Sequence, residues 1–189
     1  TVGIVGMGGN GRMLAQVLGP WDVRIVATDY FPVDPPPEIE SLMPADHLDD
    51  LLEVSDIVIL TLPLNEQTAG LFDTARISRM RPGSYLVNVA RGAVVQEAAL
   101  VEALSRGHLA GAALDVTEVE PLAPTSLLWD DPKVIITPHV GAQSSSRIDD
   151  TTELACFNLR RYLAGETPLN RVDKRLGFPH PSVIWHRDT

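Results

Sequence analysis

The 189-residue sequence has one cysteine, few basic residues and no long apolar run. The single cysteine, Cys156, excludes an internal disulfide framework and a thiolate zinc cluster, and no metal site is predicted. We interpret it as a small apolar residue on a helix face. No apolar stretch approaches the ~18 residues that a membrane span needs, which excludes a membrane-spanning protein. The 15 basic residues face 25 acidic ones, for a net charge of −10, and this balance disfavours nucleic acid and anionic membranes as partners.

The sequence does contain a regular alternation of short apolar runs and helix-length segments. The strand-like runs cover residues 2–5, 23–27, 57–62, 85–89, 111–116 and 134–137. Helices are expected over residues 12–18, 47–53, 74–80 and 96–104. Because several runs are apolar at nearly every position, they are typical of parallel strands that are covered on both faces. The pattern predicts an α/β fold with a doubly wound parallel sheet.

The spacing of the apolar residues along the sequence changes after Ser144. The apolar or small residues that recur at intervals of three and four are Ile148, Thr152, Ala155, Leu159 and Leu163. This spacing predicts a long amphipathic helix. Gly165 is a suitable C-terminal cap for it. The tail from 166 to 189 has three prolines and little periodicity, so we expect a strap against another domain.

A glycine-rich loop follows the first strand and opens the first helix. Gly6, Gly8 and Gly11 form a G-x-G-x-x-G run, in which they permit a tight turn, close approach of a pyrophosphate and close helix packing. Asp29 ends the second strand, where a carboxylate can bond both adenine-ribose hydroxyls and repel a 2′-phosphate. No arginine follows it directly, so NAD is favoured over NADP. The alternative is a glycine turn and a surface aspartate without a ligand.

Three further motifs lie at predicted strand ends, where doubly wound sheets bind ligands. They cover residues 88–92, 115–121 and 137–142 and contain an arginine-glycine, a glutamate-proline and a proline-histidine pair. Taken singly, Arg91 reads as a surface charge, Glu120 as a loop acid and His139 as a core imidazole. Together, in this order and spacing, they resemble the D-isomer-specific 2-hydroxyacid dehydrogenases, over residues 1 to about 170.

The resemblance implies a role for each catalytic residue. Arg91 would bind the substrate carboxylate as a permanently charged bidentate donor. His139 would be the general acid in ketoacid reduction and the general base in hydroxyacid oxidation, since the ordinary pKa of an imidazole is about 6.5. Glu120 would hold that imidazole and favour its protonated form. Asp115 would accept a bond from the carboxamide of nicotinamide.

The resemblance also implies the remaining cofactor contacts. Val89 and Ala90 would line the nicotinamide ring, with His139 beside it. The other positions at which the family contacts the dinucleotide are Leu62, Pro63, Thr68, Gly9, Asn10 and Gly141. Two positions depart from the family pattern: Gly9-Asn10 replaces a basic or histidine residue followed by an aliphatic one, and Thr117 stands where an aromatic or bulky apolar residue is usual.

The expected domains are an NAD-binding Rossmann domain at 1–143 and, at 144–189, the C-terminal helix and tail of a substrate domain. Because the sequence opens directly in an apolar strand, we expect the N-terminal part of that domain to lie outside these residues and the fragment to be inactive. The resemblance implies a cytoplasmic homodimer that acts on a small 2-hydroxy or 2-keto acid of the 3-phosphoglycerate, hydroxypyruvate or glyoxylate type. Three tryptophans are available for the dimer interface: Trp21, Trp129 and Trp185.

Two other functions compete with the dehydrogenase. Transcriptional corepressors of the same family keep much of this site and use NAD as a regulatory ligand, so the motifs alone do not exclude them. Other NAD enzymes, such as adenosylhomocysteine hydrolases, share the glycine loop but lack the arrangement of Arg91, Glu120 and His139.

Overall fold

The computed structural model describes residues 1–31, 33–141 and 143–184. These residues form two compact units, Thr1–His139 and Val140–Thr189. Each unit has its own internal packing, so each is described separately. The first unit contains the sheet and nearly all of the predicted site residues.

The first unit is built on a seven-stranded parallel sheet with the strand order β3-β2-β1-β4-β5-β6-β7. The strands are β1 (Val2–Val5), β2 (Ile25–Asp29), β3 (Ser41–Pro44), β4 (Ile57–Leu60), β5 (Ser84–Asn88), β6 (Leu109–Leu114) and β7 (Val134–Ile136). The order reverses between β1 and β4, which pair in parallel from Val2 opposite Ile57 to Val5 opposite Leu60. Such a reversal is the switch point at which open α/β sheets bind their ligands.

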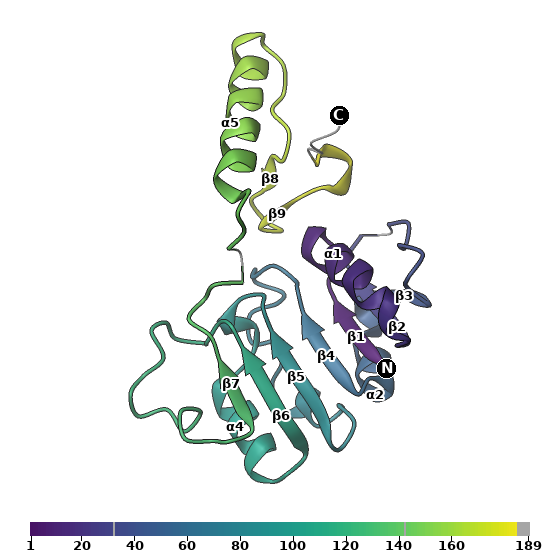
Figure 1. Ribbon diagram of the computed structural model, residues 1–189, viewed down its shortest axis with the longest axis vertical. Coiled ribbons are helices and arrows are strands. Elements are labelled where there is room, and N and C mark those ends of the chain that lie inside the picture. Colours follow the sequence, from purple (N-terminus) through teal and green to yellow (C-terminus); the bar gives the residue numbers. More distant parts are fainter. Residues whose placement is uncertain (32, 142, 185–189) are drawn as a thin grey trace. The chain divides into compact units, whose positions relative to one another are not determined.

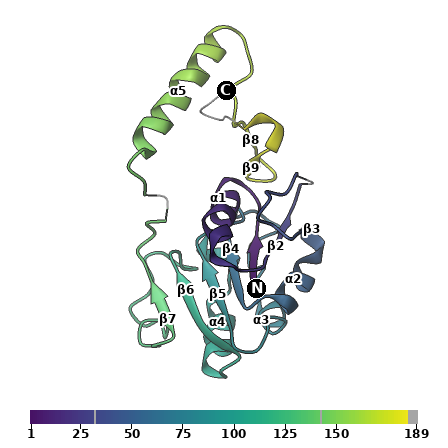
Figure 2. The ribbon, with the colours of Figure 1, turned by 45° about the vertical axis from the view of Figure 1, so that its right-hand side comes forward.

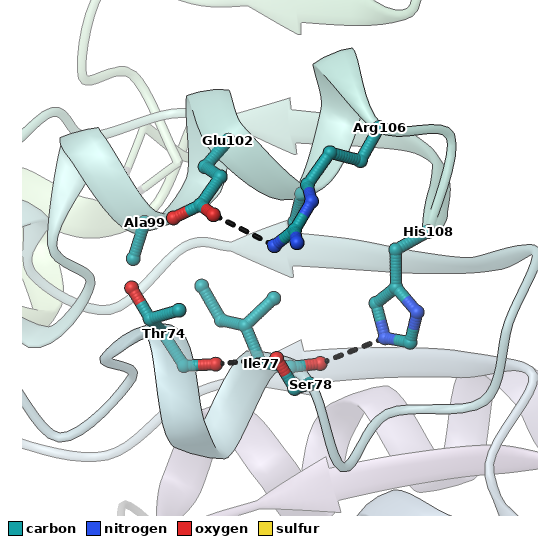
Figure 3. A pocket seen from close by; sticks show the side chains of 8 residues that line it. Thr74, Ile77, Ser78, Ala99, Glu102, Arg106 and His108 are labelled. Carbon is teal, nitrogen blue, oxygen red and sulfur yellow. Dashed lines mark hydrogen bonds and ion pairs between the residues drawn. The ribbon is translucent and has the colours of Figure 1, made fainter.

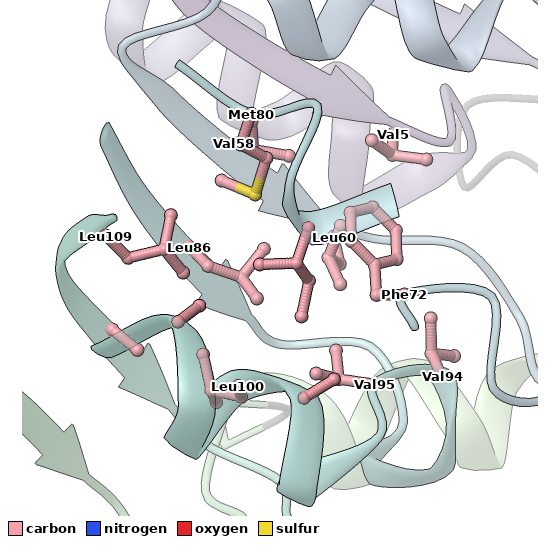
Figure 4. Packing of buried hydrophobic residues seen from close by; sticks show 14 of the residues in the cluster. Val5, Val58, Leu60, Phe72, Met80, Leu86, Val94, Val95, Leu100 and Leu109 are labelled. Atoms are coloured by element: carbon pink, nitrogen blue, oxygen red, sulfur yellow. The ribbon is translucent and has the colours of Figure 1, made fainter. Parts of the chain in front are cut away.

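Helices lie on both faces of this sheet (Figure 1). On one face, α2 (Leu48–Val54), α3 (Thr74–Ile77) and α4 (Glu97–Ser105) cover the larger core cluster. Figure 4 shows Leu60, Leu86 and Phe72 at its centre, each with no exposed surface. On the other face, α1 (Gly9–Leu18) follows β1 directly (Figure 2) and packs over β1 and β2 through Ala15. The apolar residues of β1 and β2 are therefore explained by burial between two helical layers.

The face that carries α1 is less completely covered within residues 1–139. Figure 1 shows β4, β5, β6 and β7 on this side without a helix of the first unit in front of them. Ile57, Tyr85 and Ile135 project from this face and remain exposed, Ile135 with 67% of its surface. Parallel sheets are normally covered on both faces, so this apolar surface is available for a further contact.

The second unit contains the long helix α5 (Arg147–Leu163) and a short hairpin of β8 (Val172–Asp173) and β9 (Phe178–Pro179). The side chain of Asn158 joins the helix to the segment after it: its amide donates to the Leu169 carbonyl at 3.0 Å, and its oxygen accepts from the Leu169 N–H at 2.8 Å. The predicted long helix is confirmed. The hairpin was not expected, because its strands of two residues are too short to produce a periodic pattern.

The predicted fold class is confirmed, with differences at the element boundaries. The sequence analysis missed β3, a four-residue edge strand that follows a proline-rich connection. It also extended the helix of residues 74–80 too far: α3 ends at Ile77, after which the chain makes single turns to reach Gly83, whose φ is +83°. No helix in the described part of the chain is long and apolar enough to cross a membrane. Trp185 lies outside the described residues.

Candidate cofactor and catalytic site

The glycine loop between β1 and α1 has a geometry that larger residues would not permit. Gly6 has a φ of +101°, in the left-handed region that favours glycine. A Cβ atom added to Gly11 would lie 2.2 Å from the carbonyl oxygen of Gly6. One added to Gly6 would lie 3.0 Å from the backbone of Leu62. The loop therefore packs tightly against α1 on one side and the end of β4 on the other.

The space in front of this loop fits a phosphate group. No atom lies within 4 Å of a Cβ added to Gly8 or Gly9. Gly8 is the residue before α1, at the N-cap position, and has no side chain to cap the helix, so the first N–H groups of the helix have no partner of that kind. Backbone N–H groups and the positive end of a helix dipole attract phosphate. The residues present thus suit the pyrophosphate of a dinucleotide.

Asp29 connects the glycine loop to the segment after β2. Its Oδ2 accepts a hydrogen bond from the Met7 N–H, and its Oδ1 accepts one from the Phe31 N–H at 2.9 Å. Arg12, in the first turn of α1, donates to the Asp34 carbonyl at 3.0 Å and ties the same segment to the helix. The carboxylate thus lies at the carboxyl end of β2, in contact with the Met7 N–H of the glycine loop.

The segment after β4 closes the other side of the glycine loop. Leu62 is buried, and Pro63 and Thr68 are half-buried. The Thr68 hydroxyl donates to the Pro63 carbonyl at 2.7 Å, which folds residues 63–68 into a turn. The Thr61 hydroxyl donates to the Gly6 carbonyl at 2.7 Å. These bonds fix the position of the turn relative to the glycine loop.

Arg91 lies directly after β5 and is exposed. The buried side chain of Asn88 holds its backbone, because the Asn88 amide donates to the Arg91 carbonyl at 3.1 Å and its oxygen accepts from the Ala90 N–H at 3.0 Å. The guanidinium donates to the Ala90 carbonyl at 2.7 Å. Ala90 is 5% exposed, whereas Val89 is 38% exposed. Arg91 therefore presents a charged group at the end of the sheet from a fixed backbone.

Asp115 and His139 are connected through the ends of β6 and β7. The Thr137 hydroxyl donates to Oδ1 of Asp115 at 2.6 Å. The His139 N–H donates to the Asp115 carbonyl at 2.9 Å. His139 itself has a φ of +54°, a conformation that histidine adopts more readily than most residues. This backbone places the imidazole next to the loop that carries Glu120.

The Glu120 and His139 side chains are in contact, with 3.0 Å between Oε2 and Nδ1, and they form an ion pair when the imidazole is protonated. Their side chains retain 40% and 49% of their surface, so the electrostatic attraction is weakened by water. The main consequence of the contact is orientation: with Nδ1 directed at a carboxylate, Nε2 is the ring atom that can exchange a proton with another molecule. The arrangement can perform acid–base chemistry through Nε2 of His139.

The family model described as the D-isomer specific 2-hydroxyacid dehydrogenase, NAD binding domain, matches residues 1–141. The chain belongs to this family. The match contains the glycine loop and all three catalytic motifs up to Gly141, so the NAD cofactor predicted from the sequence is confirmed at the level of the domain.

Individual relatives in this 2-hydroxyacid dehydrogenase family agree over nearly the whole chain. A glyoxylate reductase of Thermofilum pendens is 39% identical over 179 residues, which cover 93% of this chain and 52% of that protein. A D-3-phosphoglycerate dehydrogenase of Mycobacterium tuberculosis is 37% identical over 166 residues, 88% of this chain and 31% of that protein. The chain thus spans about half of the length of the first relative and about a third of the length of the second.

A solved structure of the same family shows the same fold. The D-isomer specific 2-hydroxyacid dehydrogenase of Xanthobacter autotrophicus Py2, in complex with NADPH and MES, superposes with a TM-score of 0.87 and 37% identity. The match covers 94% of this chain and 72% of that one. The ligand of that relative is the phosphorylated cofactor, whereas the family model is described as NAD binding.

The first unit brings together every predicted site residue except Gly141. They lie at the carboxyl ends of β1, β2, β4, β5, β6 and β7 or in the segments that follow these strands. Gly141 belongs to the second unit, and Ala142 of the same motif lies outside the described residues. The roles of these residues stay predictions.

The supporting roles of four residues were not predicted from the sequence, although Thr117 was noted there as a departure from the family pattern. Thr61, Asn88, Thr117 and Thr137 each form hydrogen bonds that hold a site residue or its backbone. A usable signal was present: each is a polar residue at or just after the carboxyl end of a strand. Without the structure, nothing distinguished them from ordinary turn residues.

A cavity of about 200 Å³ lies apart from this site, in the helical layer between α3 and α4 (Figure 3). Arg106 at its rim is paired with Glu102 at 2.7 Å, and the His108 ring lies 3.1 Å from the Ile77 carbonyl. None of the predicted site residues lines it. The described residues contain no group of three or more metal-binding side chains that could hold an ion.

Proposed function

We propose that this chain is the cofactor-binding part of an enzyme that transfers a hydride between NAD(H) and a D-2-hydroxy acid or 2-keto acid. The observation that carries the proposal is the Glu120–His139 pair, at 3.0 Å, on the same sheet edge as Arg91 and the glycine loop. Family membership identifies an NAD-binding domain. The contact between Glu120 and His139 supports the proposed hydride-transfer reaction. Glyoxylate, hydroxypyruvate and 3-phosphoglycerate are the substrates we favour, in line with the names of the relatives.

The residues would act in the following way during reduction of a keto acid. NAD(H) supplies the hydride, and the protein supplies binding and the proton. The Arg91 guanidinium would bind the substrate carboxylate through two parallel hydrogen bonds. Protonated His139 would give its Nε2 proton to the carbonyl oxygen, and Glu120 would stabilise the imidazolium before that transfer. In the oxidation direction, neutral His139 would accept the hydroxyl proton.

The catalytic proposal is tested by assaying a longer form of the protein, one that spans the whole length of the relatives. It should oxidise NADH in the presence of glyoxylate, hydroxypyruvate or phosphohydroxypyruvate, with one of these keto acids clearly preferred. Absence of turnover with every 2-keto acid, in a preparation that binds NADH, would contradict the proposal.

Residues 1–189 alone are proposed to bind the cofactor with little or no turnover. Hydride transfer needs a substrate held at near-attack distance and protected from water. Arg91, Glu120 and His139 are all exposed, which supports the idea that a second wall is needed to enclose the substrate. A kcat for residues 1–189 equal to that of the longer form would contradict this proposal.

We further propose that the protein is a homodimer. Large apolar side chains are exposed on the first unit, among them Trp21 at 70% and Trp129 at 52%, as well as Tyr85 and Ile135 on the sheet. Aromatic residues of this kind are enriched at protein interfaces. Light scattering of residues 1–189 at tens of micromolar should give twice the monomer mass of 20.5 kDa. A single species with the monomer mass would contradict the dimer.

A cytoplasmic location is proposed as well. Cys156 is exposed on α5 and has no second cysteine in the chain with which to pair. Exposed unpaired thiols are typical of reducing compartments. Cell fractionation that finds the protein with secreted or periplasmic markers would contradict this location.

A further inference from the structure

The Glu120 carboxylate, in the loop of residues 117–120, has a partner at each of its oxygen atoms. Oε2 lies 3.0 Å from Nδ1 of His139, and Oε1 accepts a hydrogen bond from the Thr117 N–H at 3.2 Å. Because the Glu120 and His139 side chains are half-exposed, the attraction between them is too weak to fix their geometry alone. The backbone N–H of Thr117 is therefore the group that limits where the carboxylate can lie.

The side chain of Thr117 controls the shape of this loop. Its hydroxyl donates a hydrogen bond of 2.8 Å to the carbonyl of Val119, two residues further along. Local bonds of this kind from threonine hydroxyls to nearby backbone groups stabilise turns. Val119 is 63% exposed, so packing of its own side chain contributes little to the loop. The hydroxyl therefore closes the turn from which the Thr117 N–H reaches Glu120.

Two contacts attach this turn to the rest of the site. A Cβ atom added to Gly92 would lie 1.7 Å from the Thr117 carbonyl oxygen, so the turn rests directly on the residue that follows Arg91. The Glu118 carboxylate accepts a hydrogen bond of 2.7 Å from the Glu97 N–H at the start of α4. The base of the turn is thus fixed, and the hydroxyl of Thr117 determines how its far end presents Glu120.

We propose that Thr117 is a positioning residue for the acid–base pair: its hydroxyl closes the 117–120 turn, which orients Glu120 and thereby holds the His139 ring with Nδ1 as the donor. This inference rests on the proposed function of that pair, but it concerns the orientation of the ring rather than turnover. It can therefore be tested on residues 1–189 without a substrate.

The test is the tautomer of His139 in its neutral form, measured by long-range ¹H–¹⁵N correlation NMR in a series of increasing pH that is continued until the ring ¹⁵N shifts no longer change. A His139→Gln variant identifies the signals of this ring among the five histidines. In the original sequence His139 should carry its proton on Nδ1. Thr117→Val removes the hydroxyl at nearly constant shape, and Thr117→Ala is a second variant without it. Both should shift the ring to a mixture of the two tautomers.

Thr117→Ser is the matched control because it keeps the hydroxyl and removes only the methyl group. It should retain the Nδ1–H tautomer, with thermal midpoints measured for all three variants to show that they fold. Retention of the Nδ1–H tautomer in the valine and alanine variants, or its loss in the serine variant as well, would overturn the proposal. These outcomes are separate from those of the catalytic assay, since a ring can be correctly held in a protein that does not reduce keto acids.

Discussion

The cofactor end and the catalytic end of this site are constructed differently. At the cofactor end, the glycine loop is shaped by backbone contacts, and its neighbours Met7 and Leu62 are 2% and 8% exposed. At the catalytic end, the working groups are side chains: Glu120 and His139 retain 40% and 49% of their surface. The cofactor end is anchored in the core through the side chains of Met7 and Leu62, and the catalytic end is an exposed set of charges held by hydrogen bonds.

This difference implies that the two ends respond differently to substitution. A change in the glycine loop must disturb the packing of α1 against the sheet, so it should affect folding and cofactor binding together. A change at Arg91, Glu120 or His139 removes a charged group that few other residues contact, so it should affect chemistry while the fold and the cofactor site persist.

The largest expected effect is that of His139→Ala. In the longer, active form of the protein, loss of the general acid–base should lower kcat by roughly 10²–10⁴-fold. The Kd for NADH should stay close to that of the original sequence. Steady-state kinetics and calorimetry measure the two quantities. The control is His108→Ala, because His108 directly precedes β6, at the opposite end of that strand from Asp115, and lines the separate cavity between α3 and α4. An unchanged kcat in His139→Ala would show that the catalytic end does not act as proposed.

Gly11→Ala should disrupt both the packing of the glycine loop and the binding of the cofactor. The added Cβ would lie 2.2 Å from the Gly6 carbonyl, and relief of this overlap requires α1 to move. We expect a loss of about 1–3 kcal/mol in the free energy of unfolding, as for other overpacked sites, together with weaker NADH binding. Urea denaturation checks the first quantity.

Gly9→Ala is the matched control, since its Cβ would meet open space in the same helix turn. It should leave the free energy of unfolding unchanged or slightly raised, because alanine is the better helix former. Equal stability of Gly11→Ala and Gly9→Ala would mean that the glycine loop is not packed as described.

A smaller effect is expected for Arg91→Lys. The charge remains, but the planar pair of donors for a carboxylate is lost. In the active form KM should rise about tenfold, which corresponds to roughly 1.4 kcal/mol, with a smaller change in kcat. Arg106→Lys is the control, because Arg106 is a surface residue paired with Glu102. A KM that does not change would argue against carboxylate binding by Arg91.

The same difference between the two ends explains what could be predicted from the sequence. The strands and the glycine loop were predictable because burial imposes apolar runs and fixed glycine positions, which a pattern reveals. The identities of Arg91, Glu120 and His139 came from the motifs, but their mutual geometry did not. The contacts of Thr117 and Asn88 depend on turns whose conformation no periodicity encodes.

The smallest expected effect concerns cofactor choice at Asp29. Its carboxylate lies beside the glycine loop and should disfavour the 2′-phosphate of NADPH. Asp29→Asn removes this negative charge, so the ratio of the Kd for NADPH to that for NADH should fall by several-fold, to a value nearer one. Asp34→Asn is the control, because Asp34 accepts the hydrogen bond from Arg12 with its backbone carbonyl, which the substitution leaves intact. If the ratio of the Kd for NADPH to that for NADH is the same in Asp29→Asn and Asp34→Asn, the proposed role of Asp29 is contradicted.

The most direct measurement is a calorimetric titration of residues 1–189 with NADH and, separately, with NADPH. If the glycine loop, the open start of α1 and Asp29 form a complete cofactor site within the first unit, one NADH should bind per chain, and it should bind more tightly than NADPH. Tighter or equal binding of NADPH would contradict the role of Asp29, and absence of binding by both would contradict the cofactor site itself.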